Sequence, residues 1–241
     1  MVSVETLHYE FELANNRLHT SWGKDIPSVD IDAYLNQSKD IILERYNELV
    51  EKNRKWMEHL RVLHIPDVKL KRIKKTDEYD IYDLPSDYYS YLRVSAKACS
   101  AKCSKPQAIM TTDYTKSDSL NESLKDPFRQ PSWYFRRGLY NFVSDGLQFY
   151  HQNQYDVKEL RLSYVKYLEN VAAPSLCKGQ QYIASDGVTV IGEDQHLNLP
   201  ANGTLWRKIP HLAAYLFKRD VDENYKVSLD SFLFNESLGA N

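Results

Sequence analysis

Residues 29–46 read VDIDAYLNQSKDIILERY and predict the first half of a long helix. Their apolar side chains recur three, four or seven residues apart, which places them on one face of an α-helix. Asp30 is suited to cap the N-terminus of this helix, and Pro66 ends the pattern. We therefore expect a helix over residues 30–63, about 50 Å long at a rise of about 1.5 Å per residue. The stripe consists of Ile31, Leu35, Ile42, Tyr46, Leu49, Trp56 and Leu60.

A helix of this length has to cover its apolar stripe with another long element, from the same chain or from a second copy. Two shorter helices are expected at residues 4–18 and 204–219, where apolar residues keep the same spacing. Pro210 lies inside the second of these helices and should kink or split it. The residues of the long helix that we expect at a subunit interface are Leu35, Ile42, Tyr46, Leu49 and Trp56.

Residues 67–192 carry the signals of six to eight strands. Residues 92–98 alternate between apolar and polar side chains, as in a half-buried strand, and another strand is expected at 132–136. Asp145-Gly146 predicts a hairpin whose type I′ turn has positive φ at both residues, and Asp186-Gly187 predicts a second hairpin.

These elements predict an α+β fold. The short N-terminal helix, the long helix and the C-terminal helix would form a bundle with a β-rich antiparallel insertion and an extended C-terminal arm. The expected parts are residues 1–66 (helical), 67–199 (β-rich), 200–222 (the C-terminal helix, packing back on the helical part) and 223–241 (the arm).

Composition narrows the class of protein. The chain has 241 residues with 31 basic and 33 acidic side chains, which does not fit a strongly basic nucleic-acid binder. The three cysteines cannot pair fully, so a reducing compartment is expected. The apolar runs are too short to cross a bilayer, and the first residues do not form a secretory signal. Tyrosine is abundant, with 18 residues, which is typical both of strands and of interfaces.

No catalytic pattern stands out in the sequence. It contains no phosphate-binding glycine loop, no G-x-S-x-G nucleophile turn and no H-E-x-x-H pair among its seven histidines. We therefore expect no catalytic residues, no cofactor and no metal site, and we do not expect an enzyme.

The segment VKLKRIKK, residues 68–75, is the strongest local charge feature. Its basic side chains either protect an exposed edge strand against aggregation or form a patch that faces phosphates. Repeated around a ring, such a patch would line a DNA channel with positive charge. The candidate patch residues are Lys69, Lys71, Arg72, Lys74 and Lys75.

The C-terminal segment SLDSFLFNESLGAN carries apolar side chains in a polar context. It either folds back onto the chain's own core or reaches a neighbouring subunit as an arm. The candidate interface residues in this segment are Phe232, Leu233 and Phe234.

The order of these features resembles the head–tail connector proteins (adaptor or ring proteins) of short-tailed bacteriophages, most of all those of crAss-like phages. The stretches that carry the resemblance are the helix starting VDIDAYLNQSKDIILERY, the turn LPSD at 84–87, the hairpin LYNFVSDGLQFY, the strand KELRLSYVKYLENVAAP, and LNLP ahead of the last helix. The resemblance spans most of residues 4–220, and its motifs are structural.

The resemblance implies a non-enzymatic virion protein. Members of this family form dodecameric rings below the portal protein, extend the DNA channel and dock the next layer of the tail. The expected partners are copies of the chain itself, the portal protein, adjacent tail or ring proteins, and packaged double-stranded DNA that passes through the lumen during genome ejection. The expected location is the head–tail junction of the virion, assembled in the bacterial cytoplasm, with no membrane partner.

A binding module for carbohydrate or nucleic acid is the alternative. Aromatic rings on strands can stack on sugars or bases, unless they alternate into a β core. The candidate platform residues are Trp133, Tyr134, Phe135, Tyr140, Phe149 and Tyr150.

Overall fold

A computed structural model describes residues 1–18, 26–100, 105–115, 119–177, 182–183, 190–201 and 203–221. The fold is mixed α+β, and the described residues contain five α-helices and one curled eight-stranded sheet. The chain forms two compact units. The helical unit comprises Met1–Val62 together with Leu168–Asn241, and the β unit comprises Leu63–Tyr167. The expected β-rich part, 67–199, is therefore longer than the β unit, because residues 168–199 belong to the helical unit.

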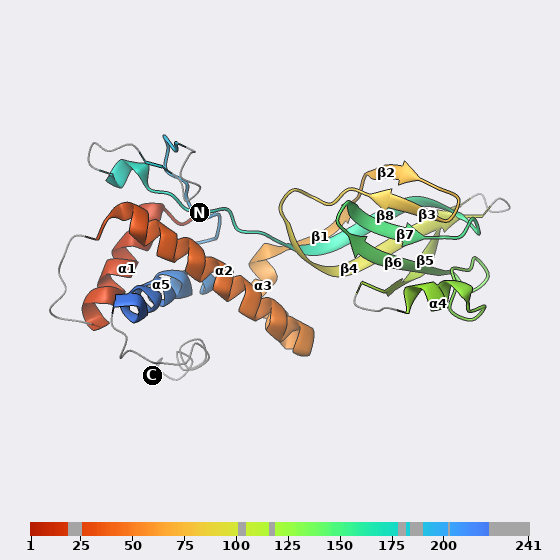
Figure 1. The fold of residues 1–241 in the computed structure, drawn as a ribbon, viewed down its shortest axis with the longest axis horizontal. Coiled ribbons are helices and arrows are strands. Elements are labelled where there is room, and N and C mark those ends of the chain that lie inside the picture. Colours follow the sequence, from red (N-terminus) through yellow and green to blue (C-terminus); the bar gives the residue numbers. More distant parts are fainter. Residues whose placement is uncertain are drawn as a thin grey trace. The chain divides into compact units, whose positions relative to one another are not determined.

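Three helices form the core of the helical unit, in which α5 packs against both α1 and α2 (Figure 1). The prediction of helices near both ends of the chain is confirmed. The rings of Phe11 on α1 and Tyr34 on α2 both meet Phe217 on α5 edge-on. The helices are α1 Val4–Leu18, α2 Ser28–Lys52, α3 Met57–Leu60 and α5 Leu205–Val221, with short 3₁₀ turns at Arg54–Trp56, Arg61–Leu63 and Pro174–Leu176.

The long helix is shorter than predicted, because α2 ends at Lys52. Asn53 takes an extended conformation, with φ −152° and ψ 114°, and its side-chain oxygen accepts a hydrogen bond from the Lys55 backbone N–H. This local bond replaces helical hydrogen bonding, which is how asparagine commonly interrupts helices. At the other end, Asp30 lies in the first turn of α2, and Pro27 occupies the cap position that we assigned to Asp30.

Most of the expected interface stripe on α2 lies in the core of its own chain. Leu35, Ile42 and Tyr46 are buried, with at most 5% of each residue exposed. The expectation that these three side chains meet a second copy is therefore wrong, because α1, α5 and the turns that follow α2 cover them within one chain. Leu49 and Trp56 are half-buried, and their interface role stays a prediction. The other candidates, Phe232, Leu233 and Phe234, lie outside the described residues.

Pro210 lies within α5, which continues through it as a single helix. The expectation that Pro210 splits this helix is wrong. A proline costs one backbone hydrogen bond to the residue four positions earlier. Here the loss is offset by burial, because Ile209, Leu212 and Leu216 on α5 are almost completely covered.

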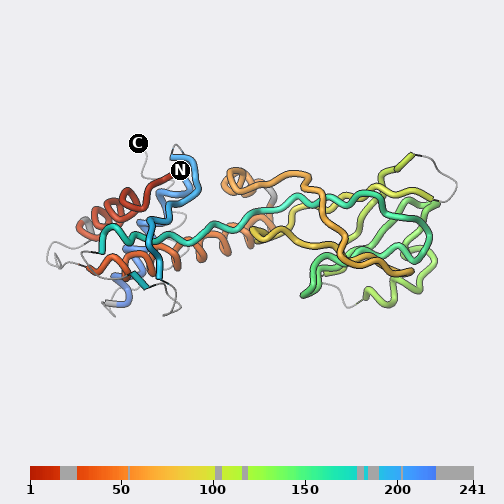
Figure 2. The backbone as a smooth tube through the Cα atoms, turned by 90° about the horizontal axis from the view of Figure 1, so that it is seen from above, coloured from red at the N-terminus to blue at the C-terminus, as the bar shows by residue number. Residues whose placement is uncertain are grey.

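After β8 the chain returns to the helical unit, as the backbone in Figure 2 shows. Polar side chains of α2 hold it there. Lys39 donates to the Leu168 carbonyl at 2.9 Å. One turn earlier, Asn36 makes two hydrogen bonds with the backbone of Val171, at 3.0 and 2.8 Å. Another turn earlier, Asp32 accepts from the Ala173 N–H at 2.9 Å. The spacing of these three α2 residues matches the helical repeat, so one face of α2 satisfies backbone groups of this segment. Ala172 pairs with other backbone there, in an antiparallel bridge with Gln195.

The β unit contains one sheet in the order β1-β8-β4-β5-β6-β7-β3-β2. β1 and β2 are separated only by Leu70 and Lys71, so one bent segment forms both edges of the sheet and curls it around a core. The elements are β1 His64–Lys69, β2 Arg72–Lys75, β3 Tyr79–Tyr82, β4 Tyr88–Cys99, β5 Gln107–Asp113, α4 Leu120–Lys125, β6 Arg137–Val143, β7 Gly146–Tyr150 and β8 Asp156–Lys166.

The insertion is not wholly antiparallel as predicted, because β5 and β6 pair in parallel. Parallel neighbours need a crossover connection. Residues 114–136, which include α4, carry the chain back to the start of β6. The other neighbouring strands pair antiparallel.

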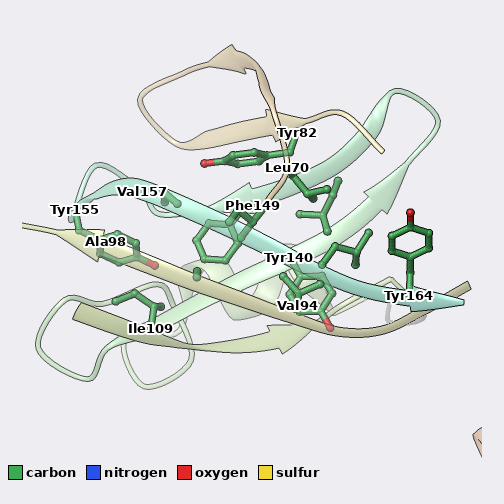
Figure 3. Close-up of a cluster of buried hydrophobic side chains, with 14 residues drawn as sticks. Leu70, Tyr82, Val94, Ala98, Ile109, Tyr140, Phe149, Tyr155, Val157 and Tyr164 are labelled. Atoms are coloured by element: carbon green, nitrogen blue, oxygen red, sulfur yellow. The ribbon is translucent and has the colours of Figure 1, made fainter. Parts of the chain in front are cut away.

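Buried aromatic rings fill the space inside the curled sheet, and Phe149 lies among them (Figure 3). Val94, Ala96 and Ala98 point inward from β4, which confirms the predicted alternation over 92–98. Buried tyrosines bring their hydroxyl groups to polar partners: the Tyr155 hydroxyl, for example, donates to the Arg137 carbonyl at 2.7 Å. Tyrosine abundance therefore reflects, in part, a core built from amphipathic rings.

The turns differ in detail from the prediction. The hairpin between β6 and β7 is confirmed, but Asp145 does not have positive φ, and Gly146, at φ 135°, is already the first residue of β7. A Cβ at Gly146 would lie 2.2 Å from the Tyr82 carbonyl oxygen, so this position requires glycine for space as well. Two consecutive positive φ values occur instead at Gln152 and Asn153, between β7 and β8.

Two further expectations concern short segments. Residues 133–136 form a turn rather than a strand, and Arg136 has φ 49° within it. The turn residues Asp186-Gly187 of the second predicted hairpin lie outside the described residues; Ile183 and Val190 on either side form an antiparallel bridge.

Candidate nucleic-acid interface

The five predicted patch residues are all exposed, but they do not lie on one strand. Lys69 ends β1 and Lys71 lies in the link to β2. The remaining three, Arg72, Lys74 and Lys75, belong to β2. Because β1 pairs with β8 and β2 pairs with β3, the basic segment crosses from one end of the curled sheet to the other.

Two of the five cations are engaged by carboxylates of the same unit. The Arg72 guanidinium lies 3.0 Å from Asp80 and 3.6 Å from Asp156. The Lys75 ammonium lies 2.8 Å from the same Asp156 carboxylate. Arg72 and Lys75 therefore contribute less to an external field than their positions in the sequence suggest.

Asp80 is a fully buried carboxylate on β3. Besides Arg72, it accepts a hydrogen bond from the Tyr82 hydroxyl at 3.3 Å, and the buried His151 ring nitrogen lies 3.5 Å away. Burial alone would raise the pKa of the Asp80 carboxyl, but the interactions with His151 and Arg72 outweigh it and hold the pKa below its usual value. Arg72 is thus a structural residue that anchors β2, rather than a cation reserved for a ligand.

The carboxylates that anchor β2 make the stability of the β unit sensitive to acid. A carboxyl group whose pKa is lower in the folded than in the unfolded protein stabilises the fold at pH values above its unfolded pKa. This stabilisation is lost as the pH falls through the pKa of the folded state. The pKa of Asp156 is lowered to about 2, mainly by hydrogen bonds from Lys158 and Lys75. We expect the free energy of unfolding to decrease as the pH falls below about 4, and we expect Asp80→Asn to make this decrease smaller.

Urea unfolding at pH 5, 4, 3 and 2, followed by circular dichroism, measures this effect. Asp83→Asn is the matched control, because Asp83 is exposed and follows β3 directly. An Asp80→Asn variant with the same pH dependence as the unmodified protein would contradict the assignment.

A second set of basic side chains lies on the outer face of β1, β8 and β4. On β4 the apolar residues point into the core, so that Arg93 and Lys97 face outward. On β8, Arg161 lies between two buried leucines and also faces outward. In the sheet register, Arg161 is flanked by Lys69 of β1 on one side and Ser95 of β4 on the other. The outer face therefore brings cations from three strands together.

Two adjoining hollows mark this face. The first has a volume of about 320 Å³ and the second about 370 Å³, and they share the lining residues Lys97, Ala108 and Glu159. The basic lining residues of the two hollows taken together are Lys69, Arg93, Lys97, Lys158 and Arg161. The acidic lining residues are Asp67 and Glu159.

Ion pairs neutralise only part of this charge. Glu159 accepts two hydrogen bonds from Arg161, at 2.9 and 2.7 Å, and lies 3.7 Å from Lys97. These hydrogen bonds from Arg161 lower the pKa of the Glu159 carboxyl and keep it charged. Lys158 is 2.6 Å from Asp156. Among the basic residues of segment 68–75 and of the two hollows, four have no carboxylate of the described residues at ion-pair distance: Lys69, Lys71, Lys74 and Arg93.

The sequence prediction missed Arg93, Lys97, Lys158 and Arg161, although a signal was present. Arg93 and Lys97 occupy the polar positions of the alternating segment 92–98. Because successive side chains of a strand point to opposite faces, this pattern places both residues on the outer surface of the sheet. Their proximity to Lys69 could not be derived, because it depends on β8 pairing between β1 and β4.

Comparison with known proteins does not decide the function. No protein-family model and no curated protein matches this chain. Among the residues that the structure describes, no helix is long and apolar enough to cross a membrane. The same residues contain no group of three or more histidine, cysteine, aspartate or glutamate side chains arranged to hold a metal ion.

The alternative aromatic platform is divided between core and surface. Tyr140 and Phe149 are buried inside the sheet, and Trp133 and Tyr150 are half-buried. Of the six rings, Tyr134 and Phe135 are the exposed ones, and they lie on a turn. The platform as predicted is therefore not present as one surface.

Proposed function

We propose that this chain is a non-enzymatic structural protein of the head–tail connector of a short-tailed bacteriophage. Copies of it would form a ring, expected to be a dodecamer, below the portal protein and above the next tail proteins. The observation that carries the proposal is the basic outer face of β1, β8 and β4, which gathers Lys69, Arg93, Lys97 and Arg161 around adjoining hollows. In a ring, this face would line the channel through which double-stranded DNA passes.

The distribution of charge supports this role. The β unit, residues 63–167, carries 17 basic and 13 acidic side chains, whereas the rest of the chain carries 14 and 20. The near-neutral total therefore combines a β unit of net charge +4 with a helical unit of net charge −6. A few phosphate contacts per subunit bind DNA weakly and without sequence preference, and repetition around a ring adds them up. Weak contacts of this kind guide DNA without retaining it.

The finer architecture belongs to the same proposal. The three-helix part would form the body of each subunit, the β unit would be its insertion, and residues 223–241 would form the arm. Since α1 and α5 cover the α2 stripe, contacts between subunits would use other surfaces. Leu49 and Trp56, both half-buried, remain candidates for such contacts.

The test is a DNA titration with a matched control. A triple variant, Lys69→Gln, Arg93→Gln and Lys97→Gln, removes three cations from the outer face. Each lost phosphate contact lowers the slope of log affinity against log salt by about 0.9 for duplex DNA. We expect weaker binding of a short DNA duplex and a slope smaller by about 2–3, measured by fluorescence anisotropy at 50–200 mM salt.

The control variant replaces Lys52, Lys55 and Arg61 of the helical unit with glutamine, so both triple variants carry the same net charge. The control is expected to keep the slope of the unmodified protein. Equal affinity and slope in both triple variants would overturn the DNA-facing assignment. Negative-stain micrographs of the unmodified protein, alone and with a portal protein, test the ring itself.

A further inference from the structure

We propose that residues 126–137, here called the aromatic turn, form a self-association surface that docks on the acidic outer face of α2 in a second copy. The inference rests on the proposed ring, because it assigns the contact that would join neighbouring subunits. A turn on one subunit and a helix face on the next make a heterologous contact, which is the type that closes into rings.

The aromatic turn concentrates exposed apolar surface. Within the described part of the β unit, five large apolar side chains are more than half exposed. Three of them, Phe128, Tyr134 and Phe135, lie on the aromatic turn, with exposed fractions of 79%, 86% and 54%. A fourth, Met110, is hydrogen-bonded through its backbone N–H to the Arg136 carbonyl at 2.6 Å and so lies beside the turn. Exposed apolar groups gathered in this way mark interaction surfaces.

Hydrogen bonds hold the turn in one shape. The Phe128 N–H donates to the Asp126 carboxylate at 2.8 Å, and the Arg137 guanidinium donates to the Phe128 carbonyl. Ser132 and Arg137 exchange two backbone hydrogen bonds at 3.0 and 2.9 Å. The Tyr134 and Phe135 rings meet edge-on at 5.0 Å. A surface ordered before binding loses less conformational entropy when it docks.

The backbone of Arg136 is strained. Its φ of 49° is in the left-handed region, which costs a non-glycine residue of the order of 1 kcal/mol. Arg136 and Arg129 are both exposed on the turn, and Arg129 lies 3.4 Å from the Asp126 carboxylate. Tyrosine, phenylalanine and arginine together are the composition typical of protein interfaces. The strained arginine therefore belongs to a surface that is cationic as well as aromatic.

The outer face of α2 has the opposite charge. Its exposed carboxylates lie three or four residues apart from Asp40 to Glu51, and the helical unit as a whole has a net charge of −6. These exposed residues are Asp30, Asp40, Glu44, Glu48 and Glu51. Within α2, Glu48 lies 2.7 Å from Arg45 and Asp40 lies 3.5 Å from Lys39, so these pairs offset part of the charge. A cationic aromatic turn and an acidic helix face are complementary, which favours a second copy of this chain as the occupant. Duplex DNA is less suitable for the rings, because its bases are already stacked inside the helix.

The experiment is sedimentation velocity of the full-length protein over a range of concentrations at low salt. Phe128→Ala with Tyr134→Ala removes the exposed rings, and the dissociation constant for self-association should rise at least tenfold. Arg129→Glu with Arg136→Glu should weaken association similarly, and adding Glu44→Lys with Glu48→Lys should restore it. Tyr9→Ala, which removes an exposed ring from α1, is the control and should change nothing. Circular dichroism spectra verify that each variant is folded.

The outcomes separate the two proposals. If the aromatic variants assemble like the unmodified protein, or if the charge exchange restores nothing, the docking contact is overturned and the ring proposal stands. If the variants dissociate but the unmodified assemblies are not annular in micrographs, the docking contact stands and the ring proposal fails. An unmodified protein that remains monomeric at all concentrations overturns both.

Discussion

An Asp32→Ala variant is expected to lose about 3–5 kcal/mol of unfolding free energy, which is the cost of removing one partner from a buried charged network. The Asp32 carboxylate is almost completely buried on α2 and has three partners. One oxygen lies 2.7 Å from the His8 ring nitrogen, and the other accepts from the Tyr182 hydroxyl at 2.8 Å and from the Ala173 N–H. Alanine would leave all three groups buried without an acceptor.

Urea unfolding followed by circular dichroism at 222 nm, a wavelength that reports helix, measures the loss for Asp32→Ala. Asp30→Ala is the control, because Asp30 is exposed two residues earlier on the same helix. Its removal should cost no more than about 1 kcal/mol, from the lost interaction with the helix dipole. A loss for Asp32→Ala as small as that of the control would show that the network does not hold the helical unit together.

A Gly138→Ala variant is expected to destabilise the β unit by about 1–3 kcal/mol through overpacking. Gly138 lies in β6, and a Cβ there would be 2.3 Å from the Phe149 ring and 2.8 Å from the Tyr155 hydroxyl. Both aromatic residues are buried, and Phe149 is fully enclosed. Neither ring can move without disturbing its neighbours in the core. The glycine is therefore required for space.

Differential scanning calorimetry measures the fall in melting temperature for Gly138→Ala. Gly192→Ala is the control, since no described residue other than its two chain neighbours has an atom within 4 Å of a Cβ at that position. Adding Phe149→Leu to Gly138→Ala should recover part of the loss, because leucine leaves room where the ring edge was. Equal melting temperatures for Gly138→Ala and Gly192→Ala would contradict the overpacking argument.

Local sequence patterns predicted the helices and strands that are determined by residues close to them in the sequence. The apolar spacing of residues 4–18 predicts α1, and the alternation of 92–98 predicts the middle of β4. The end of α2 depended on one side-chain hydrogen bond at Asn53, which periodicity does not register. The parallel pairing of β5 with β6 could not be derived either, because it follows from the path of the chain through α4.

The candidate interface was also predictable only in the part that is determined by residues close together in the sequence. The run VKLKRIKK indicated where positive charge begins, and Lys69 does lie on the basic outer face. Arg93 and Arg161 are far away in the sequence and reach the same face through sheet order alone. Arg72 stood in the same run, yet its role is set by the buried Asp80, which the sequence could not identify as its partner.

The position of the β unit between two halves of the helical unit has a consequence for synthesis on the ribosome. α1 and α2 emerge first, but α5, which covers their apolar faces, follows only after Tyr167. At about 5–20 residues per second, the nascent chain carries this uncovered surface for about 5–20 s or more while the intervening unit is translated. The helices would be most vulnerable to aggregation during that interval.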